Sequence, residues 1–321
     1  MGQAGPMTDT RASSSPAPRV AVTGATGAVG GRVARTLAAA GVPLRLVVRD
    51  ASRAPDLGGA DVEVSVATYG DHDASVAALT GVDTLFMVSA AEAVDRLAQH
   101  RAFVDAAAEA GVRHVVYTSF QGAGPDAVFT LARDHAATEQ HLVASGLATT
   151  ILRDSFYLDV LPEFADESGV LRGPAGEGRV AAVARADVAD VAAVVLQDPE
   201  AHAGRTYELT GPEALTLSEV VARLSAVLGR PFTYHPETVE EAYESRQRWQ
   251  PEPWQADAWV STYTSIASGE VSRVTSDVRD VAGHEPLSIE ALFGRESQGQ
   301  GDAGSDAGSD VSGRDGTTAP R

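Results

Sequence analysis

The sequence predicts an α/β fold of the Rossmann type, a doubly wound parallel sheet with a smaller α/β substrate (cap) domain. Two patterns predict this fold. Short apolar runs alternate with helical patterns through the first half of the chain, as in parallel sheets that are covered by helices on both faces. A glycine-rich turn follows the first apolar run and opens the first helix, which is typical of this fold.

Six apolar runs have the length of buried strands, at residues 20–22, 44–48, 62–66, 84–88, 114–117 and 148–152. Helical patterns lie between them, at residues 32–40, 73–79, 95–110 and 130–144. Three of these helices end at a glycine, namely Gly41, Gly111 and Gly146. Residues 19–160 therefore form the predicted Rossmann domain.

The second half is less regular, and residues 161–294 form the predicted mixed substrate domain. We expect Asp187 to open a helix of about ten residues. Residues 205–209 are expected to form a strand, so that residues 180–210 partly return to the sheet. Further helices are predicted at residues 217–228, 238–248 and 254–267. The last carries Trp259, Tyr263 and Ile266 on one face, which favours core packing over ligand binding.

Both ends of the chain lack a hydrophobic pattern. Residues 1–18 are rich in Ser, Ala, Pro and Gly, and residues 295–321 contain a Gly-Ser-Asp near-repeat. Such segments bury little apolar surface, so both are expected to be disordered, the second as an acidic tail.

The composition excludes several chemistries. The 321 residues include no cysteine, so there is no disulfide, thiolate nucleophile or cysteine-bound metal. They also include no lysine, which excludes a Schiff base and a Tyr-x-x-x-Lys catalytic pair. The histidines are scattered without ligand spacing, so no metal site is expected.

The chain is strongly acidic, with 25 basic and 44 acidic residues and a net charge of −19. Such a surface repels nucleic-acid phosphates and anionic lipid, so neither nucleic acid nor a membrane is an expected partner. No apolar stretch approaches the roughly 20 residues of a membrane span, and no signal peptide is evident. We therefore expect a cytoplasmic protein.

The glycine turn is the most specific motif. Its first glycine permits a tight turn, its second lets backbone approach a pyrophosphate, and its third lets helix and strand pack closely. Free N–H groups at the helix start then receive the phosphates. The predicted cofactor-binding residues here are Gly24, Ala25, Thr26, Gly27, Ala28, Val29 and Gly30.

The end of the second strand indicates which dinucleotide binds. An acidic residue there holds a ribose hydroxyl, whereas an arginine suits a 2′-phosphate. This chain has Arg49, with Arg53 four residues later, so NADP is favoured over NAD. Asp50 lies between them and leaves NAD open, because its carboxylate could face the ribose.

Small residues end the fourth and fifth strands and are expected to border the same crevice, because ligands bind at the carboxyl ends of parallel strands. Ser89 and Ala90 end the fourth strand, and Thr118 and Ser119 end the fifth. Such residues also form ordinary turns, so both interpretations stay open.

The chain resembles the NmrA-like group of atypical short-chain dehydrogenases/reductases, and within it the bacterial NAD(P)H:quinone oxidoreductases. The likeness spans residues 19–293. Matching segments occur at residues 22–30, 48–49, 69–71, 81–82, 99–101, 110–112, 117–119, 134–139, 145–146, 152–153, 156–157, 185–187, 207–209 and 283–286.

The resemblance implies that NADP is held by residues 24–29, Arg49, Ser89 and the segment 154–159, which includes Asp154, Ser155 and Phe156. The chain departs from the family at Asp154, where the family has asparagine, and at Thr68, where it has aspartate.

An ordinary short-chain dehydrogenase uses Ser, Tyr and Lys to handle a proton. Ser119 is in the place of the serine, but Leu131 and His135 hold the Tyr and Lys positions. Alcohol chemistry, which needs that proton, is therefore poorly supported. A quinone accepts hydride without it, so we expect hydride transfer from NADPH to a quinone or similar conjugated carbonyl.

Ser119 and Tyr157 are the candidate catalytic residues. Tyr157 follows the sixth strand, where its side chain could either contact the substrate or pack in the core. Tyr117 is expected to be structural, and His135 is expected to pair with Glu139 one helical turn away.

The alternative is a non-catalytic NmrA-type redox sensor, which binds dinucleotide and acts through a protein partner. Loss of the Tyr-Lys pair fits either function. A sugar-nucleotide epimerase would need that pair. A homodimer is plausible through helices that flank the sheet.

Overall fold

The computed structural model describes residues 20–58 and 61–299. In this part of the chain, one seven-stranded sheet has the order β3-β2-β1-β4-β5-β6-β9, and every adjacent pair is parallel. The strands are β1 (Val20–Thr23), β2 (Leu44–Val48), β3 (Val62–Val66), β4 (Thr84–Met87), β5 (His114–Phe120), β6 (Ala148–Asp154) and β9 (Thr206–Leu209). This confirms the predicted doubly wound parallel sheet.

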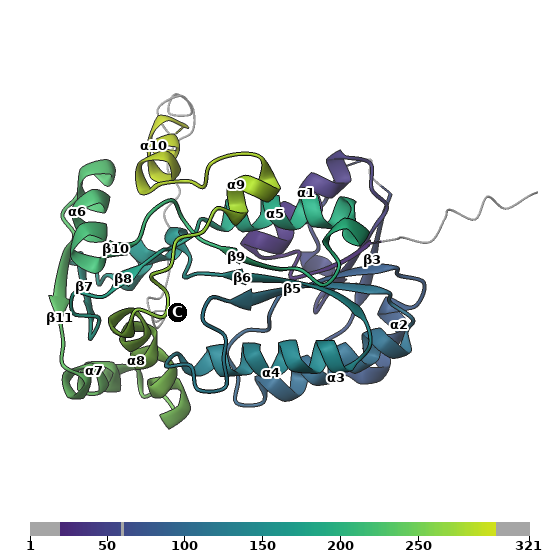
Figure 1. Cartoon of the computed structure of the whole chain (residues 1–321), viewed down its shortest axis with the longest axis horizontal. Helices are drawn as coiled ribbons and strands as arrows, with labels where there is room; N and C mark the ends of the chain where they lie inside the picture. Colours follow the sequence, from purple (N-terminus) through teal and green to yellow (C-terminus); the bar gives the residue numbers. More distant parts are fainter. Residues whose placement is uncertain (1–19, 59–60, 300–321) are drawn as a thin grey trace, which may run out of the picture.

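Helices cover both faces of the sheet (Figure 1). One layer contains α1 (Ala28–Ala39), α5 (Arg185–Gln197) and α9 (Asp277–Ala282). The other contains α2 (His72–Leu79), α3 (Arg96–Glu109) and α4 (Thr130–Ala144). Two apolar clusters fill the spaces between sheet and helices, one on each face. Strands β1, β4 and β5 are buried throughout, because they lie in the middle of the sheet.

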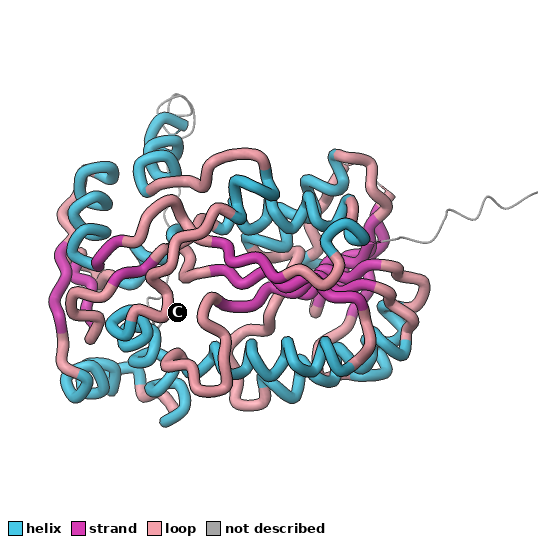
Figure 2. The backbone as a smooth tube through the Cα atoms, viewed as in Figure 1, coloured by secondary structure: helices cyan, strands magenta, loops and turns pink. Residues whose placement is uncertain are grey.

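A smaller unit lies beyond the carboxyl ends of the strands (Figures 1 and 2). It contains the parallel pair β7 (Val170–Gly173) and β11 (Thr233–Pro236), and the antiparallel pair β8 (Arg179–Val180) and β10 (Leu215–Thr216). Its helices are α6 (Leu217–Leu228), α7 (Val239–Arg246), α8 (Pro253–Ser268) and α10 (Ile289–Gly299). A third apolar cluster joins it to the ends of β5 and α4.

Local sequence signals explain several boundaries. Helix α6 begins with a capping box between Thr216 and Glu219, and ends at Gly229 with a φ of 66°. Thr238 and Glu241 form a second capping box at α7. The described part of the chain also contains short 3₁₀ helices, η1 (Ala51–Arg53), η2 (Leu158–Phe164), η3 (Pro199–His202) and η4 (Gln247–Trp249).

Some predicted boundaries differ. The helix expected to open at Asp187 begins at Arg185 and has 13 residues. Asp187 lies inside its first turn, fully buried, where its carboxylate accepts the Leu287 N–H at 2.8 Å. The expected capping role of Asp187 belongs to Asp159 of η2, whose carboxylate accepts the backbone N–H of Arg185 at the start of the helix.

Residues 205–209 were expected to return to the sheet, and β9 does so beside β6. Helix α10 continues to Gly299, beyond the predicted limit at residue 294. The predicted disorder of residues 1–18 and 300–321 lies outside the described residues. None of the helices in the described ranges combines the length and apolar composition that crossing a bilayer requires.

Candidate functional site

The glycine turn joins β1 to α1 at the centre of the sheet. Gly24 has a φ of 63°, which a residue with a side chain rarely adopts, and its carbonyl accepts the Gly27 N–H at 2.9 Å. A Cβ atom on Gly30 would lie 2.4 Å from the Gly24 carbonyl oxygen. The turn therefore requires glycine at both positions, as the motif predicts.

The N-terminus of α1 is open. Gly27 is the N-cap and provides no side chain, and the first turn contains no acidic residue. Thr26, Gly27 and Ala28 are exposed, whereas Ala25 and Val29 are buried in the core. The helix dipole and its free N–H groups thus face solvent, which suits an anionic ligand such as a pyrophosphate. Ala25 and Val29 can contribute backbone groups only.

Arginines follow β2 at the neighbouring strand end. Arg49 is exposed and makes no hydrogen bond or ion pair with any described residue. The Asp50 carboxylate caps η1, accepting both the N–H and the hydroxyl of Ser52 at 2.9 and 2.7 Å. These hydrogen bonds, the hydroxyl's above all, lower the pKa of Asp50. Asp50 is thus engaged with its own turn, while Arg49 and Arg53 remain exposed.

A tyrosine that sequence reasoning did not single out braces β1 against β4. The Tyr69 hydroxyl donates to the Val88 carbonyl at 2.6 Å and lies 2.7 Å from the Thr23 hydroxyl. That Thr23 oxygen accepts the Val88 N–H at 2.9 Å. Thr23, a hydroxyl residue directly before the glycine turn, was the available signal.

The segment after β4 has its backbone held by side chains. The Ser89 N–H donates to the Thr118 hydroxyl at 2.8 Å, and the Ala90 N–H donates to His100 Nε2 at 2.8 Å. The Ala90 carbonyl accepts from Arg96 Nε at 2.9 Å. Sequence reasoning did not assign this role to Arg96 or His100. Their side chains fix the predicted Ser89-Ala90 wall of the crevice.

The expected pairing of His135 with Glu139 is wrong. His135 lies 2.9 Å from both Arg96 Nη2 and the Tyr117 hydroxyl, from α3 and β5 respectively. Tyr117 is fully buried, which confirms its structural assignment. Burial lowers the pKa of His100 to about 3, and burial lowers that of His135 well below its usual range. Both imidazoles are therefore neutral at working pH.

Ser119 lies within β5, which runs three residues further than predicted. Its hydroxyl donates to Glu139, whose carboxylate also accepts two hydrogen bonds from Arg153, at 2.9 and 2.6 Å. Ser119 is buried, so its hydroxyl is engaged within the protein. Its catalytic role remains a prediction.

Asp154 ends β6 and is 5% exposed. Its carboxyl group lies 2.7 Å from the Tyr157 hydroxyl, and burial raises its pKa to about 8. A carboxyl that keeps its proton at neutral pH carries no charge to repel a nearby anion. Burial raises the pKa of Tyr157 as well. The role of Tyr157 as a substrate contact remains a prediction.

The residues after Asp154 close this end of the crevice. Ser155 is buried, and its hydroxyl has no partner among the described residues. The Phe156 ring is partly buried and packs edge-on against Phe120 and Phe129, with centroids 4.9 and 5.4 Å away. An aromatic cluster thus lies where β5, β6 and the small unit meet.

A groove of about 490 Å³ lies elsewhere, at the free edge of β9, and is lined by polar residues of β9 and the segment 273–277. In that groove the Glu208 N–H donates to the Asp277 carboxylate at 2.7 Å. Since β9 lies four strands from β1, this groove is separate from the glycine turn.

The parallel sheet, the glycine turn and the open helix N-terminus define a Rossmann protein of the dinucleotide-binding class. The NmrA-like family model matches residues 16–252, and the chain belongs to that family. It is 38% identical over 221 residues to quinone oxidoreductase 2 of Escherichia coli, which covers 67% of this chain and 76% of that protein.

A second relative and a solved structure cover more of the chain. It is 33% identical over 267 residues to the NAD(P)H azoreductase of Xenophilus azovorans, covering 82% of this chain and 93% of that protein. The crystal structure of the Escherichia coli NADPH-dependent quinone oxidoreductase in complex with NADPH superposes with a TM-score of 0.79 at 31% identity, covering 87% and 99% of the two chains.

Proposed function

We propose that this protein is an NADPH-dependent reductase that transfers hydride to a quinone or a similar conjugated carbonyl. The observation that carries the proposal is the open α1 N-terminus next to Arg49, which is exposed and has no partner among the described residues. The helix end suits a pyrophosphate and Arg49 suits a 2′-phosphate, so both sites for a phosphorylated dinucleotide lie at adjacent strand ends.

Each residue of the site has a proposed binding role. Backbone N–H groups of residues 24–30 hold the pyrophosphate. Arg49 and Arg53 hold the 2′-phosphate, so that NADP binds in preference to NAD. The Ser89-Ala90 wall orients the nicotinamide ring of the cofactor, and Asp154, Ser155 and Phe156 lie on the other side of that ring. When bound, the nicotinamide supplies the hydride.

Among the described residues, neither Ser119 nor His135, which hold two of the proton-handling positions, is free to protonate an alkoxide. His135, in the place of the missing lysine, is buried and neutral, and Ser119 already donates to Glu139. A reduced quinone is a weak base that water can protonate, so positioning alone suffices for the reaction. Tyr157 is proposed to contact the acceptor, with its hydroxyl held by Asp154. The names of the two relatives, a quinone oxidoreductase and an azoreductase, support a conjugated acceptor.

The test is acceptor-dependent oxidation of NADPH, followed at 340 nm with 1,4-benzoquinone and with no-protein and NADH controls. We expect saturable loss of absorbance that is proportional to protein concentration and faster with NADPH. Absence of turnover despite NADPH binding would contradict the proposal. That outcome would favour the redox sensor, which the missing Tyr-Lys pair equally permits.

A further inference from the structure

All three tryptophans of the chain lie in one segment of eleven residues, 249–259, which belongs to the small unit. Trp249 ends η4, and Trp254 and Trp259 lie on α8. All three are partly buried, and none belongs to the described apolar clusters. Tyr263 and Ile266, expected on the same helix face as Trp259, are buried as predicted. Trp259 therefore departs from the core assignment of that face.

Two of the tryptophans form a pair. The Trp249 and Trp259 rings are 6.2 Å apart between centroids and nearly perpendicular, at 86°. The guanidinium carbon of Arg248 lies 3.8 Å from the Trp249 centroid. Two partly buried indoles bordered by a cation offer aromatic surface against which a flat ring can stack.

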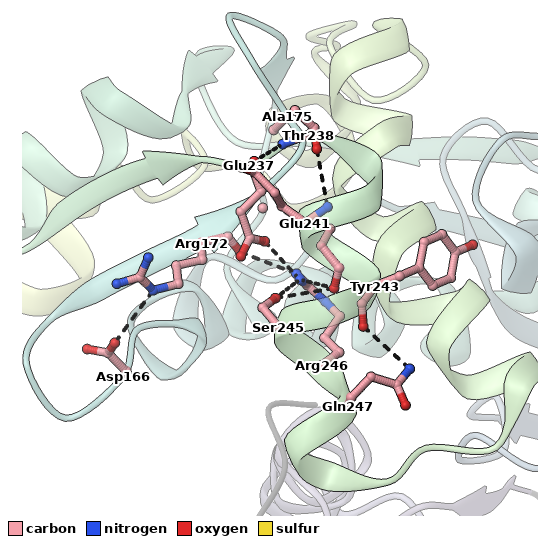
Figure 3. Close-up of polar contacts among 12 residues, drawn as sticks. Asp166, Arg172, Ala175, Glu237, Thr238, Glu241, Tyr243, Ser245, Arg246 and Gln247 are labelled. Carbon is pink, nitrogen blue, oxygen red and sulfur yellow. Dashed lines mark hydrogen bonds and ion pairs between the residues drawn. The ribbon is translucent and has the colours of Figure 1, made fainter.

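A buried ion pair between Arg246 and Glu237 lies at the end of α7, shortly before Trp249 in the chain (Figure 3). Arg246, three residues earlier, donates to Glu237 at 2.9 Å, and the two side chains are 7% and 4% exposed. Arg246 also donates to the Ala242 carbonyl and to the Arg172 carbonyl, at 2.9 and 3.3 Å. These bonds tie α7 to β7 and β11, so the backbone that leads to Trp249 is rigidly held.

The same arginine supports α8. Its guanidinium carbon lies 5.1 Å from the centroid of the Tyr263 ring, one helical turn from Trp259. That ring packs against Gly173, where a Cβ atom would lie 2.2 Å from it. Arg246 therefore orders both elements that carry the tryptophan pair, which lowers the entropic cost of binding a ligand there.

The pair borders the proposed crevice. Trp259 Nε1 donates to the Glu92 carboxylate at 3.3 Å, and Glu92 lies two residues after Ala90. Ser261 on the same helix accepts the Thr130 N–H of α4 at 3.2 Å. Tyr263 belongs to the cluster that contains Phe120 and Phe129. Helix α8 thus runs from the Ser89-Ala90 wall to the aromatic cluster at the ends of β5 and β6.

We propose that Trp249 and Trp259 form a stacking wall that selects flat acceptors with two or more fused or conjugated rings. This inference rests on the proposed reductase function and names the substrate class of that same site. A single-ring acceptor bound at the Ser89-Ala90 wall has little surface to place on the indoles, whereas an extended planar acceptor reaches them.

The test compares 1,4-benzoquinone with the two-ring menadione in wild type and Trp259→Ala, at saturating NADPH. The KM for menadione is expected to rise about fivefold to tenfold, the range of one lost stacking contact. The KM for benzoquinone should change by less than about twofold, and Trp259→Phe should restore most of the menadione affinity. Trp254→Ala is the matched control, because Trp254 has no aromatic partner among the described residues.

Quenching of tryptophan emission by menadione reports binding without turnover. Replacing Trp249 and Trp259 together by phenylalanine should remove most of the quenching, and Trp254→Phe should preserve it. Equal KM changes for both acceptors, or the same quenching in both variants, would overturn the inference. If wild type binds menadione through Trp249 and Trp259 but reduces neither acceptor, the reductase proposal fails while the stacking wall stands.

Discussion

At the scale of single residues, Asp154 is a buried carboxyl group at the end of β6, where we propose that the nicotinamide ring binds. Its pKa is raised to about 8 by burial, whereas an unfolded aspartate has a pKa of about 4. The native state therefore holds one more proton than the unfolded state between these values. The associated stability is fully present below the unfolded pKa and is lost as pH rises toward the folded pKa.

We expect Asp154→Asn to remove this pH dependence, because the amide can still accept the Tyr157 hydroxyl without becoming charged. The free energy of unfolding of wild type should fall relative to the variant by about 1.4 kcal/mol per pH unit between the two pKa values. Urea unfolding at about pH 5 and about pH 8 measures this. Parallel pH profiles would show that the buried carboxyl is ionised.

Arg49 is the residue that we propose separates NADPH from NADH. Arg49→Ala should raise the Kd of NADPH about 10- to 100-fold, the effect of losing a charge-assisted hydrogen bond, and leave NADH nearly unchanged. Titration of cofactor fluorescence measures both. Arg101→Ala, an equal change of charge on an exposed residue of α3, is the control. If NADPH and NADH weaken together, Arg49 does not read the phosphate.

At the scale of elements, the β1–α1 turn depends on close packing. Gly30→Ala places a Cβ atom 2.4 Å from the Gly24 carbonyl, so the helix must shift. We expect a loss of about 1–3 kcal/mol in the free energy of unfolding and weaker NADPH binding. Gly70→Ala is the control, since its nearest contact would be 3.8 Å away. Thermal unfolding with and without NADPH measures both effects, and an unchanged Tm for Gly30→Ala would refute the packing argument.

The segment after β4 depends on His100. His100→Ala leaves the Ala90 N–H without its partner, at an expected cost of about 1–3 kcal/mol, and should raise the KM for NADPH. His100→Gln can accept the same hydrogen bond and should restore the KM. Because burial keeps His100 neutral, its titration should leave no inflection near pH 6.5 in the rate profile. Normal NADPH affinity in His100→Ala would show that the wall does not depend on this contact.

Local pattern was sufficient for the strands and helices of the first half, because apolar runs and terminal glycines are local signals. The helix over residues 130–144 was predicted to the residue. Local sequence pattern was insufficient to predict which side chains contact each other. His135 binds Arg96, 39 positions away, rather than Glu139 one turn away, and only the packing of α3 against α4 determines this. Strands β8 and β10 have two residues each, too few for a periodic pattern.

At the scale of the whole molecule, the small unit that carries α7 and α8 lies beyond the carboxyl ends of the parallel strands (Figure 1). The expected return of residues 205–209 to the sheet is what brings the chain back beside β6. Gln121 at the end of β5 then donates to the Arg273 carbonyl at 2.8 Å, which ties the small unit to the sheet. The expected homodimer stays a prediction, for which sedimentation is the measurement.

In the proposed reaction, a bound nicotinamide passes hydride from one defined face to the acceptor. The most direct measurement uses NADPH carrying deuterium at either position of C4, with 1,4-benzoquinone as acceptor and mass analysis of the NADP⁺ produced. We expect that one labelled form yields NADP⁺ that retains deuterium and the other yields NADP⁺ that has lost it. Mixed retention from both forms, or no protein-dependent NADP⁺, would contradict it.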